Sequence, residues 1–425
     1  MREIKVPKGI ILKLDDGTAR FVPNHAPATQ PDPGVLRADY PAFKRAVEAA
    51  ALATCAGKLF PAYNCLHLRQ LSGTLTVFAW DTDGLSIQAS LPAVGADGEW
   101  LLPKKPVLVA VKPRKATTPL EMRMDSWRAR IGGETIQIPA DVMPEDYCRD
   151  DKNTWLIKRE VKMPAEEFAA AINEVLYAAP ENDTRYFLNG VLFDFIASGP
   201  QAGLHLVATD AHRLVRRKLA VRHQEDGRYI LSFSAAAALA KVCAGARGNL
   251  CLTVQHDSVY PSHERLVFDL PDKVRLTGKV IDGRFPDYWG VIPSGAENRI
   301  ELQREAALSV LVKMRNEYKE YASRSGRKKY TASSLRMYFS PSAVTFQVDD
   351  SHRPEGSTWT PPRGECPAIV TGVTPEYILI NYWYLVEMLR HYPDDDVPFN
   401  LFDSDLKMLS ISTEKNDVII MRINM

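Results

Sequence analysis

The fold is decided around one stretch of the chain, Val207-Ala208-Thr209-Asp210-Ala211-His212-Arg213-Leu214. Apolar runs at residues 204–209 and 214–221 flank its polar centre, a pattern typical of two strands joined by a turn. Two more segments lie within about a hundred residues of it along the chain. They read Thr184-Arg185-Tyr186-Phe187-Leu188-Asn189-Gly190-Val191-Leu192-Phe193 and Asp282-Gly283-Arg284-Phe285-Pro286-Asp287-Tyr288, the latter followed by Val291-Ile292-Pro293.

Working outward, the chain shows one plan three times: an amphipathic helix, short strands, a second helix and more strands. We expect helices at residues 40–56, 165–178, 235–244, 304–323 and 382–391, the first of them capped by Asp39. A basic second segment covers residues 104–115. Ahead of the repeats, residues 4–22 predict a hairpin, and the stretch from residue 23 to 33 is rich in proline and alanine, as in a linker.

The composition is that of an ordinary folded protein, with 45% hydrophobic and 25% charged residues in a chain of 425. Lysine plus arginine number 53 against 52 acidic residues, so a nucleic-acid surface would need segregated charge. The six cysteines lack zinc spacing and are typical of reduced thiols in a cytoplasmic protein. With no apolar run of about 18 residues, we expect no membrane span.

Asp210 and His212 invite a catalytic interpretation, because residues two apart on a strand share one face. A histidine–carboxylate pair can act as a general base or hold a metal. No nucleophile elbow, phosphate-binding loop or zinc-protease motif accompanies the pair. We therefore expect no catalytic residue, no metal and no cofactor.

The three quoted segments resemble, in order and separation, segments of the bacterial DNA polymerase III beta subunit, the sliding clamp family. The resemblance covers roughly residues 37–425 and is weakest at the start. It implies an α+β fold of three DNA-clamp domains, each with two inner helices and outer antiparallel sheets, closing as a ring in the dimer. It also implies boundaries: an N-terminal extension at 1–36, then domains at 37–155, 156–293 and 294–425.

By this resemblance the protein is a non-catalytic processivity factor that encircles double-stranded DNA and tethers a DNA polymerase through short peptide motifs. A clamp-loader complex would open the homodimer, and no membrane is involved. The chain departs from the family at Ala211, where glycine is usual, at Trp289-Gly290, in its tail and in its N-terminal extension. An alternative is a clamp-like accessory that competes for replisome partners without being loaded on DNA.

The resemblance also implies two sets of binding residues. Phosphate contacts are independent of sequence, so a few inward side chains suffice for DNA. The DNA candidates are Lys44, Arg45, Lys58, Lys104, Lys112, Tyr186, Phe187, Lys241, Arg304, Lys313, Arg315, Lys319, Arg327 and Lys328. A partner-peptide pocket would use Leu188, Thr209, His212, Arg213, Leu214, Pro286, Val291, Met421, Arg422 and Ile423. Solvated helix faces and a filled domain interface are the respective alternatives.

Overall fold

A computed structural model describes residues 2–6, 9–13, 19–23, 34–54, 61–112, 120–125, 127–139, 154–293, 295, 298–324, 334–349, 360–372, 374–402 and 408–423. Three strands, β1 (Arg2–Val6), β2 (Gly9–Lys13) and β3 (Ala19–Pro23), form a small antiparallel sheet at the N-terminus. The sequence predicted a hairpin over residues 4–22, and the structure has three strands there. The rest divides into two compact units, residues 1–152 with 272–276, and residues 153–271 with 277–425.

In the described part of the chain, the order β-α-β-β-β-β-α-β-β-β occurs three times once short 3-10 turns are set aside. The first run begins with β4 (Gly34–Ala38) and α1 (Tyr40–Ala50). It continues with β5 (Cys65–Leu71), β6 (Thr74–Trp80), β7 (Ser86–Val94), β8 (Gly98–Pro103), α2 (Lys104–Ala110), β9 (Leu120–Met124), β10 (Arg128–Ile131) and β11 (Glu134–Gln137). The pattern read from the sequence is thereby confirmed in its order of elements.

Helix α1 forms where its apolar residues recur on one side. Phe43, Ala46, Val47 and Ala50 are buried, and the Asp39 carboxylate accepts a hydrogen bond from the Ala42 amide at 2.9 Å, as expected of a cap. The helix ends at Ala50, earlier than predicted, because the chain tightens into a 3-10 turn at Ala51–Ala53.

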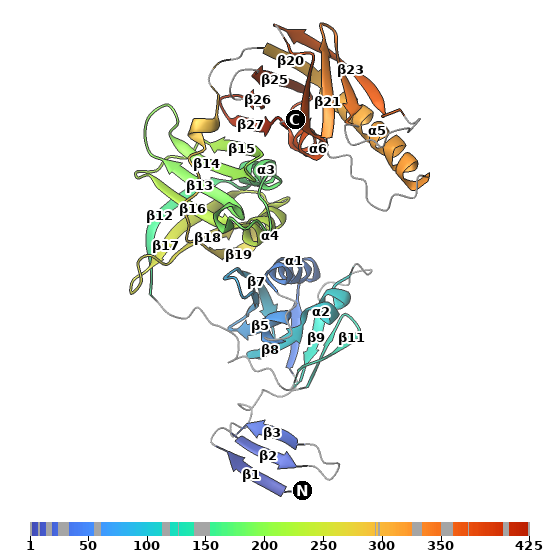
Figure 1. Ribbon diagram of the computed structural model, residues 1–425. Helices are drawn as coiled ribbons and strands as arrows, with labels where there is room; N and C mark the ends of the chain where they lie inside the picture. The colour runs from blue at the N-terminus through green and yellow to red at the C-terminus, as the bar shows by residue number, and fades with distance from the viewer. Residues whose placement is uncertain are drawn as a thin grey trace. The chain divides into compact units, whose positions relative to one another are not determined.

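The second run belongs to the second unit, except for residues 274–276 of its last strand. It comprises β12 (Trp155–Pro164), α3 (Ala165–Leu176), β13 (Gly190–Ile196), β14 (Gly203–Thr209), β15 (Arg213–Leu219), β16 (Gly227–Ser232), α4 (Phe233–Cys243), β17 (Asn249–Asp257), β18 (Glu264–Leu270) and β19 (Val274–Lys279). Helices α3 and α4 pack against each other and lie side by side in Figure 1. Their buried faces are rich in alanine, which allows the close approach.

The third run repeats the order with β20 (Asn298–Gln303), α5 (Arg304–Arg324), β21 (Ser334–Ser340), β22 (Ala343–Val348), β23 (Arg363–Thr371), β24 (Tyr377–Asn381), α6 (Tyr382–His391), β25 (Asp396–Phe402), β26 (Met408–Ser412) and β27 (Asn416–Met421). Asn381 caps α6 by accepting from the amides of Trp383 and Tyr384. The sequence predicted α6 correctly but not β20, β23 or β24, and in β23 glycine, proline and charged residues interrupt the apolar alternation.

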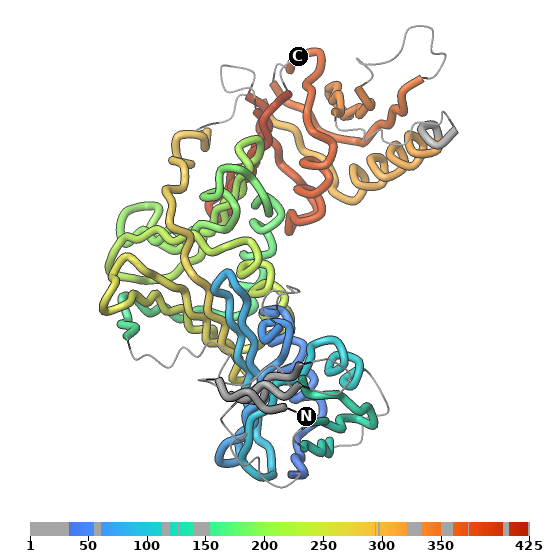
Figure 2. The backbone as a smooth tube through the Cα atoms, turned by 60° about the horizontal axis from the view of Figure 1, so that its bottom comes forward, coloured from blue at the N-terminus to red at the C-terminus, as the bar shows by residue number. Residues whose placement is uncertain are grey.

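The second and third runs share one sheet, because β15 pairs with β27 in antiparallel register from Arg213↔Ile420 to Arg217↔Asn416. Two views show the C-terminal strand β27, in dark red, lying along β15, in green (Figures 1 and 2). The pairing covers an edge of β15 that would otherwise expose its amide and carbonyl groups. No helix in the described residues is long and apolar enough to cross a membrane.

Candidate partner-peptide pocket and nucleic-acid surface

The turn between β14 and β15 is held by its own side chains. The Thr209 hydroxyl donates to the Arg213 carbonyl at 2.6 Å and accepts from the Ala211 amide at 3.0 Å. One Asp210 carboxylate oxygen accepts from the amides of His212 and Arg213 at 2.9 and 3.0 Å. The Asp210 carboxylate therefore binds the amides of this turn and the Arg213 side chain, while the His212 side chain is exposed to solvent.

Ala211 sits in this turn with φ at +72°, a left-handed conformation that glycine adopts without cost. The sequence predicted that alanine would restrict the backbone here. The surrounding hydrogen bonds from Thr209 and Asp210 keep the strained residue in place.

Beside the turn, one face of the sheet carries apolar residues in rows across the strands. Leu214 lies opposite Ile419, and Met408 lies opposite Met421. They join a buried cluster with residues from the connecting segment at 281–292, and the cluster's members are Leu188, Leu192, Val207, Leu214, Ile230, Phe285, Tyr288, Phe402, Met408 and Ile419. Met421 and Trp289 pack against this cluster while staying partly accessible. An apolar wall with accessible margins is suited to receive an apolar side chain of a ligand.

The structure brings together some of the residues predicted for the pocket. Leu188 and Leu214 are buried in the cluster, and Met421 borders it. Val291 and Ile423 are exposed at 36% each, and Pro286 and His212 are also exposed. The Ile423 amide donates to the Leu379 carbonyl at 2.8 Å. Thr209 is buried in the turn, and Arg422 is half-buried.

Arg213 is engaged within the protein. Its Nε lies 3.0 Å from a carboxylate oxygen of Asp210, and one terminal nitrogen donates to Glu387 on α6. Its guanidinium also stacks 4.5 Å from the centre of the Tyr384 ring. The side chain is 11% exposed, so Arg213 ties the turn to α6 and offers little to a ligand.

The connecting segment is anchored by Tyr288. Its hydroxyl donates to the buried Asp194 carboxylate at 2.9 Å. Arg228 lies 3.8 Å from the same carboxylate and donates to the Pro286 carbonyl at 3.2 Å. Burial raises the pKa of Asp194, and burial together with that carboxylate raises the pKa of Tyr288. These contacts hold Pro286 and Val291 beside the cluster.

The sequence did not reveal a cluster of buried polar side chains next to the pocket, formed by Arg216, Asp417 and His205. Arg216 and Asp417 are 3% and 2% exposed at the side chain and form an ion pair across the β15–β27 joint. His205 is fully buried beside them, and desolvation, with the nearby Arg216 charge adding to it, lowers its pKa to about 4. Asp417, a charged residue at the start of the otherwise apolar strand β27, was the available signal, because a buried charge requires a partner.

Of the predicted aromatic DNA contacts, Tyr186 is 57% exposed, whereas Phe187 packs against the pocket cluster. Their rings meet edge to face at 5.7 Å. The packing alternative therefore describes Phe187, and Tyr186 keeps an accessible ring.

The predicted cations are distributed over several helices. Lys44 and Arg45 lie on α1, Lys104 on α2 with Lys112 after it, and Lys241 on α4. Lys313 and Lys319 are exposed on α5, where Ala307, Leu311, Met314 and Tyr318 form the buried side. Arg304 pairs with Asp395 at 2.8 Å, and Arg315 stacks on Trp383 at 4.9 Å, so both are partly used inside the fold. Lys58, Arg327 and Lys328 lie outside the described residues.

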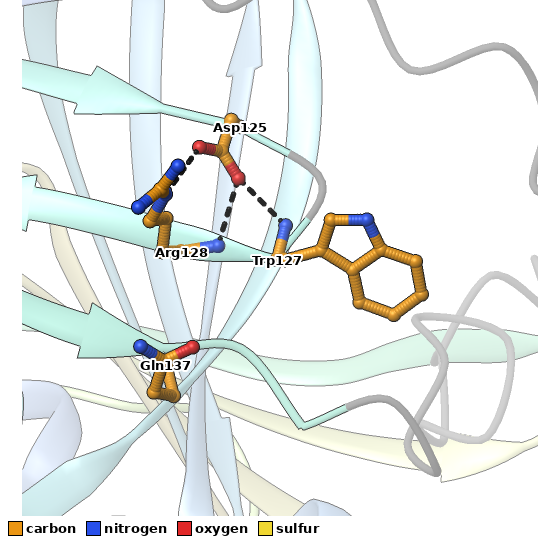
Figure 3. Close-up of a pocket in the computed structure, with 4 residues that line it drawn as sticks. All are labelled: Asp125, Trp127, Arg128 and Gln137. Carbon is orange, nitrogen blue, oxygen red and sulfur yellow. Dashed lines mark hydrogen bonds and ion pairs between the residues drawn. The ribbon is translucent and has the colours of Figure 1, made fainter.

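A shallow hollow of about 280 Å³ lies in the first unit, beside the turn between β9 and β10 (Figure 3). Asp125 accepts from the amides of Trp127 and Arg128 at 2.8 and 2.9 Å, and from the Arg128 Nε at 3.0 Å. Gln137 completes the lining, and the Trp127 ring is 59% exposed. None of the residues predicted for the peptide pocket line this hollow.

The chain matches known proteins in the region of the three segments at residues 184–193, 207–214 and 282–293. The family model for the DNA polymerase III beta subunit, central domain, matches residues 162–287. Proteins named Beta sliding clamp are 23% identical in Chlamydia pneumoniae and 24% in Haemophilus influenzae, each over 57% of this chain. The matches cover 58% and 63% of those two relatives, so the chain spans less than two thirds of their length.

Solved structures extend the likeness to nearly the whole fold. The DNA polymerase III beta subunits of Pseudomonas aeruginosa and Thermotoga maritima superpose with TM-scores of 0.74 and 0.73 at 17% identity. Each comparison covers 92% of this chain and all of the other. Residues 162–287 thus match the central domain of the DNA polymerase III beta subunit, and the fold, with its repeated order of elements, is that of the solved beta-subunit structures.

Proposed function

We propose that this protein is a DNA polymerase processivity factor, a ring-shaped sliding clamp that encircles duplex DNA and performs no chemistry. The observation that carries the proposal is the threefold recurrence of one strand and helix order, together with the central match to the beta-subunit family. A ring retains DNA by topology, so its surface needs only weak and mobile phosphate contacts.

Three domains, at residues 37–155, 156–293 and 294–425, are assigned to the ring, with residues 1–36 as an extension. The DNA surface is assigned to exposed cations of the helices, among them Arg45 on α1, Lys241 on α4, and Lys313 and Lys319 on α5. Arg304 and Arg315 contribute less, because their side chains are already paired or stacked. Tyr186 is the accessible aromatic candidate.

The peptide pocket is assigned to the cluster at the β15–β27 joint. Leu188, Leu214 and Met421 supply the apolar walls, with Val291 and Ile423 at the accessible rim. Methionine adapts its shape to different side chains, which suits a site for several partners. The DNA polymerase catalytic subunit is the first partner expected here, and a clamp-loader complex is the second.

Two copies are expected to close the ring through sheet edges. Within one copy, β15 of the second run receives β27, the last strand of the third. By position in the repeated order, β23 corresponds to β15, and β11 corresponds to β27. Among the described residues, β11 pairs only with β10, and residues 363–367 of β23 pair only with β22. The β11 strand of one copy is therefore expected to add to β23 of a second copy.

The homodimer is tested by mass in solution. Wild-type protein should have the mass of two chains, and Ile369→Asp, which places a charge on the exposed face of β23, should release single chains. Ile157→Asp is the matched control, because Ile157 is equally exposed but lies on β12. A single-chain mass for the wild type contradicts the ring.

The clamp function is tested on DNA circles. Protein is loaded on nicked circular DNA with the loader of the same host, and retention is measured before and after the circle is cut. A clamp stays on the circle and leaves the linear form. A protein that binds polymerase peptides but is never retained is instead a competitor for replisome partners.

The reduced thiols expected of a cytoplasmic protein agree with the free cysteines at positions 65, 243, 251 and 366.

A further inference from the structure

A row of polar side chains crosses the sheet beside the pocket, and its members His205, Arg216 and Asp417 are buried. Arg216 lies opposite Val207 on β14 and Asp417 on β27, and Asp417 lies opposite Ser412 on β26. The Arg216 Nε donates to one Asp417 carboxylate oxygen, and the Ser412 hydroxyl donates to the other. Both oxygens of the Asp417 carboxylate thus accept hydrogen bonds from the two strands that flank β27.

His205 completes the row on β14. Its Nδ1 lies 2.9 Å from a terminal nitrogen of Arg216, and its Nε2 lies 2.7 Å from the Gln201 carbonyl. Because Arg216 can only donate, Nδ1 accepts and Nε2 carries the hydrogen. The neutral ring therefore satisfies a second guanidinium nitrogen without adding charge.

Trp289 covers this row from the connecting segment. Its ring centre lies 5.2 Å from the Arg216 guanidinium carbon and 5.5 Å from the His205 ring. Trp289 also packs against the pocket cluster and lies 4.9 Å from the Tyr288 ring. One arginine thus contacts both structures that border the pocket: the C-terminal strand and the connecting segment.

The ion pair distinguishes the native register from the nearest alternatives. A slip of one residue would turn the apolar face of β27 outward, but a slip of two residues keeps every side chain on its face. After such a slip, Arg216 would face Lys415 or Ile419 in place of Asp417. Both arrangements leave buried charges unpaired, which is strongly unfavourable.

We propose that Arg216 is a positioning residue of the partner-peptide pocket, a role that rests on the proposed function of that pocket. With Asp417 it sets the register that places Ile419 and Met421 beside Leu214, and with Trp289 it seats the connecting segment. The pocket's shape is therefore determined by a charged pair that is itself buried in the sheet.

The register is measured with cysteine pairs. Val215 lies opposite Val418 in the native register, so Val215→Cys with Val418→Cys should cross-link on oxidation. Pairing Val215→Cys with Asn416→Cys or Ile420→Cys reports a slip of two residues in either direction. Mapping by mass spectrometry separates these bridges from those of the native cysteines.

The test variant replaces the buried pair by apolar residues, Arg216→Met with Asp417→Leu. It should keep the cooperative unfolding transition but form a slipped cross-link, and it should bind a labelled peptide from the host polymerase at least tenfold more weakly. The control variant, Arg217→Met with Asn416→Leu, lies one position along the same strands. It removes the 2.8 Å contact between these two residues and the 3.6 Å ion pair of Arg217 with Glu174. It should keep the native cross-link and the wild-type affinity.

Native cross-linking with unchanged peptide affinity in the Arg216→Met, Asp417→Leu variant overturns the positioning role. If that variant does not fold, Asp417→Asn replaces it in both measurements, with the same expected and contrary results. Failure of the wild type to bind the peptide removes the pocket assignment instead. The cross-linking result still decides whether the pair sets the register.

Discussion

The guanidinium carbon of Arg213 lies 4.5 Å from the centre of the Tyr384 ring and 5.4 Å from that of Tyr177. Arg213 therefore stands between helix α6 of the third run and the end of helix α3 in the second. Its charge is balanced by Asp210 and Glu387. Arg213, which the sequence predicts at the rim of a pocket, links the second and third runs of the fold.

Replacing Glu387 by glutamine should weaken the link that Arg213 makes between the two runs. The Arg213 side chain is 11% exposed, and the lost charge-assisted bond should lower the free energy of unfolding by about 1 kcal/mol. Urea unfolding measures the loss. Glu317→Gln is the control, since Glu317 meets the exposed Lys313 only at 4.0 Å, and it should change stability little. Equal effects of the two substitutions argue against the role of Arg213.

Ala211→Gly should stabilise the protein. The left-handed conformation costs alanine about 1–2 kcal/mol, which the substitution removes. Glycine's extra freedom in the unfolded chain offsets about 0.5–1 kcal/mol of this stabilisation. A net increase of roughly 0.5–1 kcal/mol in the free energy of unfolding remains. Ala220→Gly, at an exposed alanine that is not among the positive-φ residues, should be destabilising. A loss of stability in both variants shows that Ala211 is not strained.

Stability should fall below neutral pH because of His205. Its pKa is lowered to about 4 by burial, so the unfolded chain binds a proton more readily from pH 6.5 downward. The stabilising contribution is complete above pH 6.5 and is lost as the pH falls toward 4. Between pH 7 and pH 5 the loss amounts to about 2 kcal/mol. His205→Gln should show a smaller pH dependence in urea unfolding, whereas His212→Gln, at an exposed position, should behave as wild type.

Neutralising Lys313 and Lys319 together should weaken binding to duplex DNA and flatten its dependence on salt. Each lost phosphate contact should reduce the slope of log affinity against log salt by about 0.9. Arg315 is left in place because it stacks on Trp383. Lys162→Ala, on strand β12, is the control and should leave the slope unchanged. An identical slope in the double variant places these lysines away from DNA.

Local patterns in the sequence were enough to predict most helices and the repeated plan. Helix α6 has the predicted bounds, because its apolar spacing, the Asn381 cap and its basic last turn agree. Strand β23 was missed, since Gly364, Glu365 and Pro367 obscure its alternation while β20 and β22 supply its pairing. Tertiary pairing overrides weak local preference there.

The pocket shows the same limit. Leu188, Leu214 and Met421 were found by resemblance and lie at one cluster. However, Glu387, the second partner of Arg213, is 174 residues away along the chain, and Asp417, the partner of Arg216, is 201 residues away. Only the folded protein shows that these arginines already bond to distant residues, so their availability to a ligand could not be read from the sequence.

The pairing of β15 with β27 also has a consequence for biosynthesis. The 201 residues between Arg216 and Asp417 take a ribosome roughly 10–40 s to translate at about 5–20 residues per second. Throughout that interval, the nascent chain presents an uncapped strand with an unneutralised arginine. Charge at that edge discourages neighbouring nascent chains from adding to it, and so protects the growing polypeptide from aggregation until its own tail emerges.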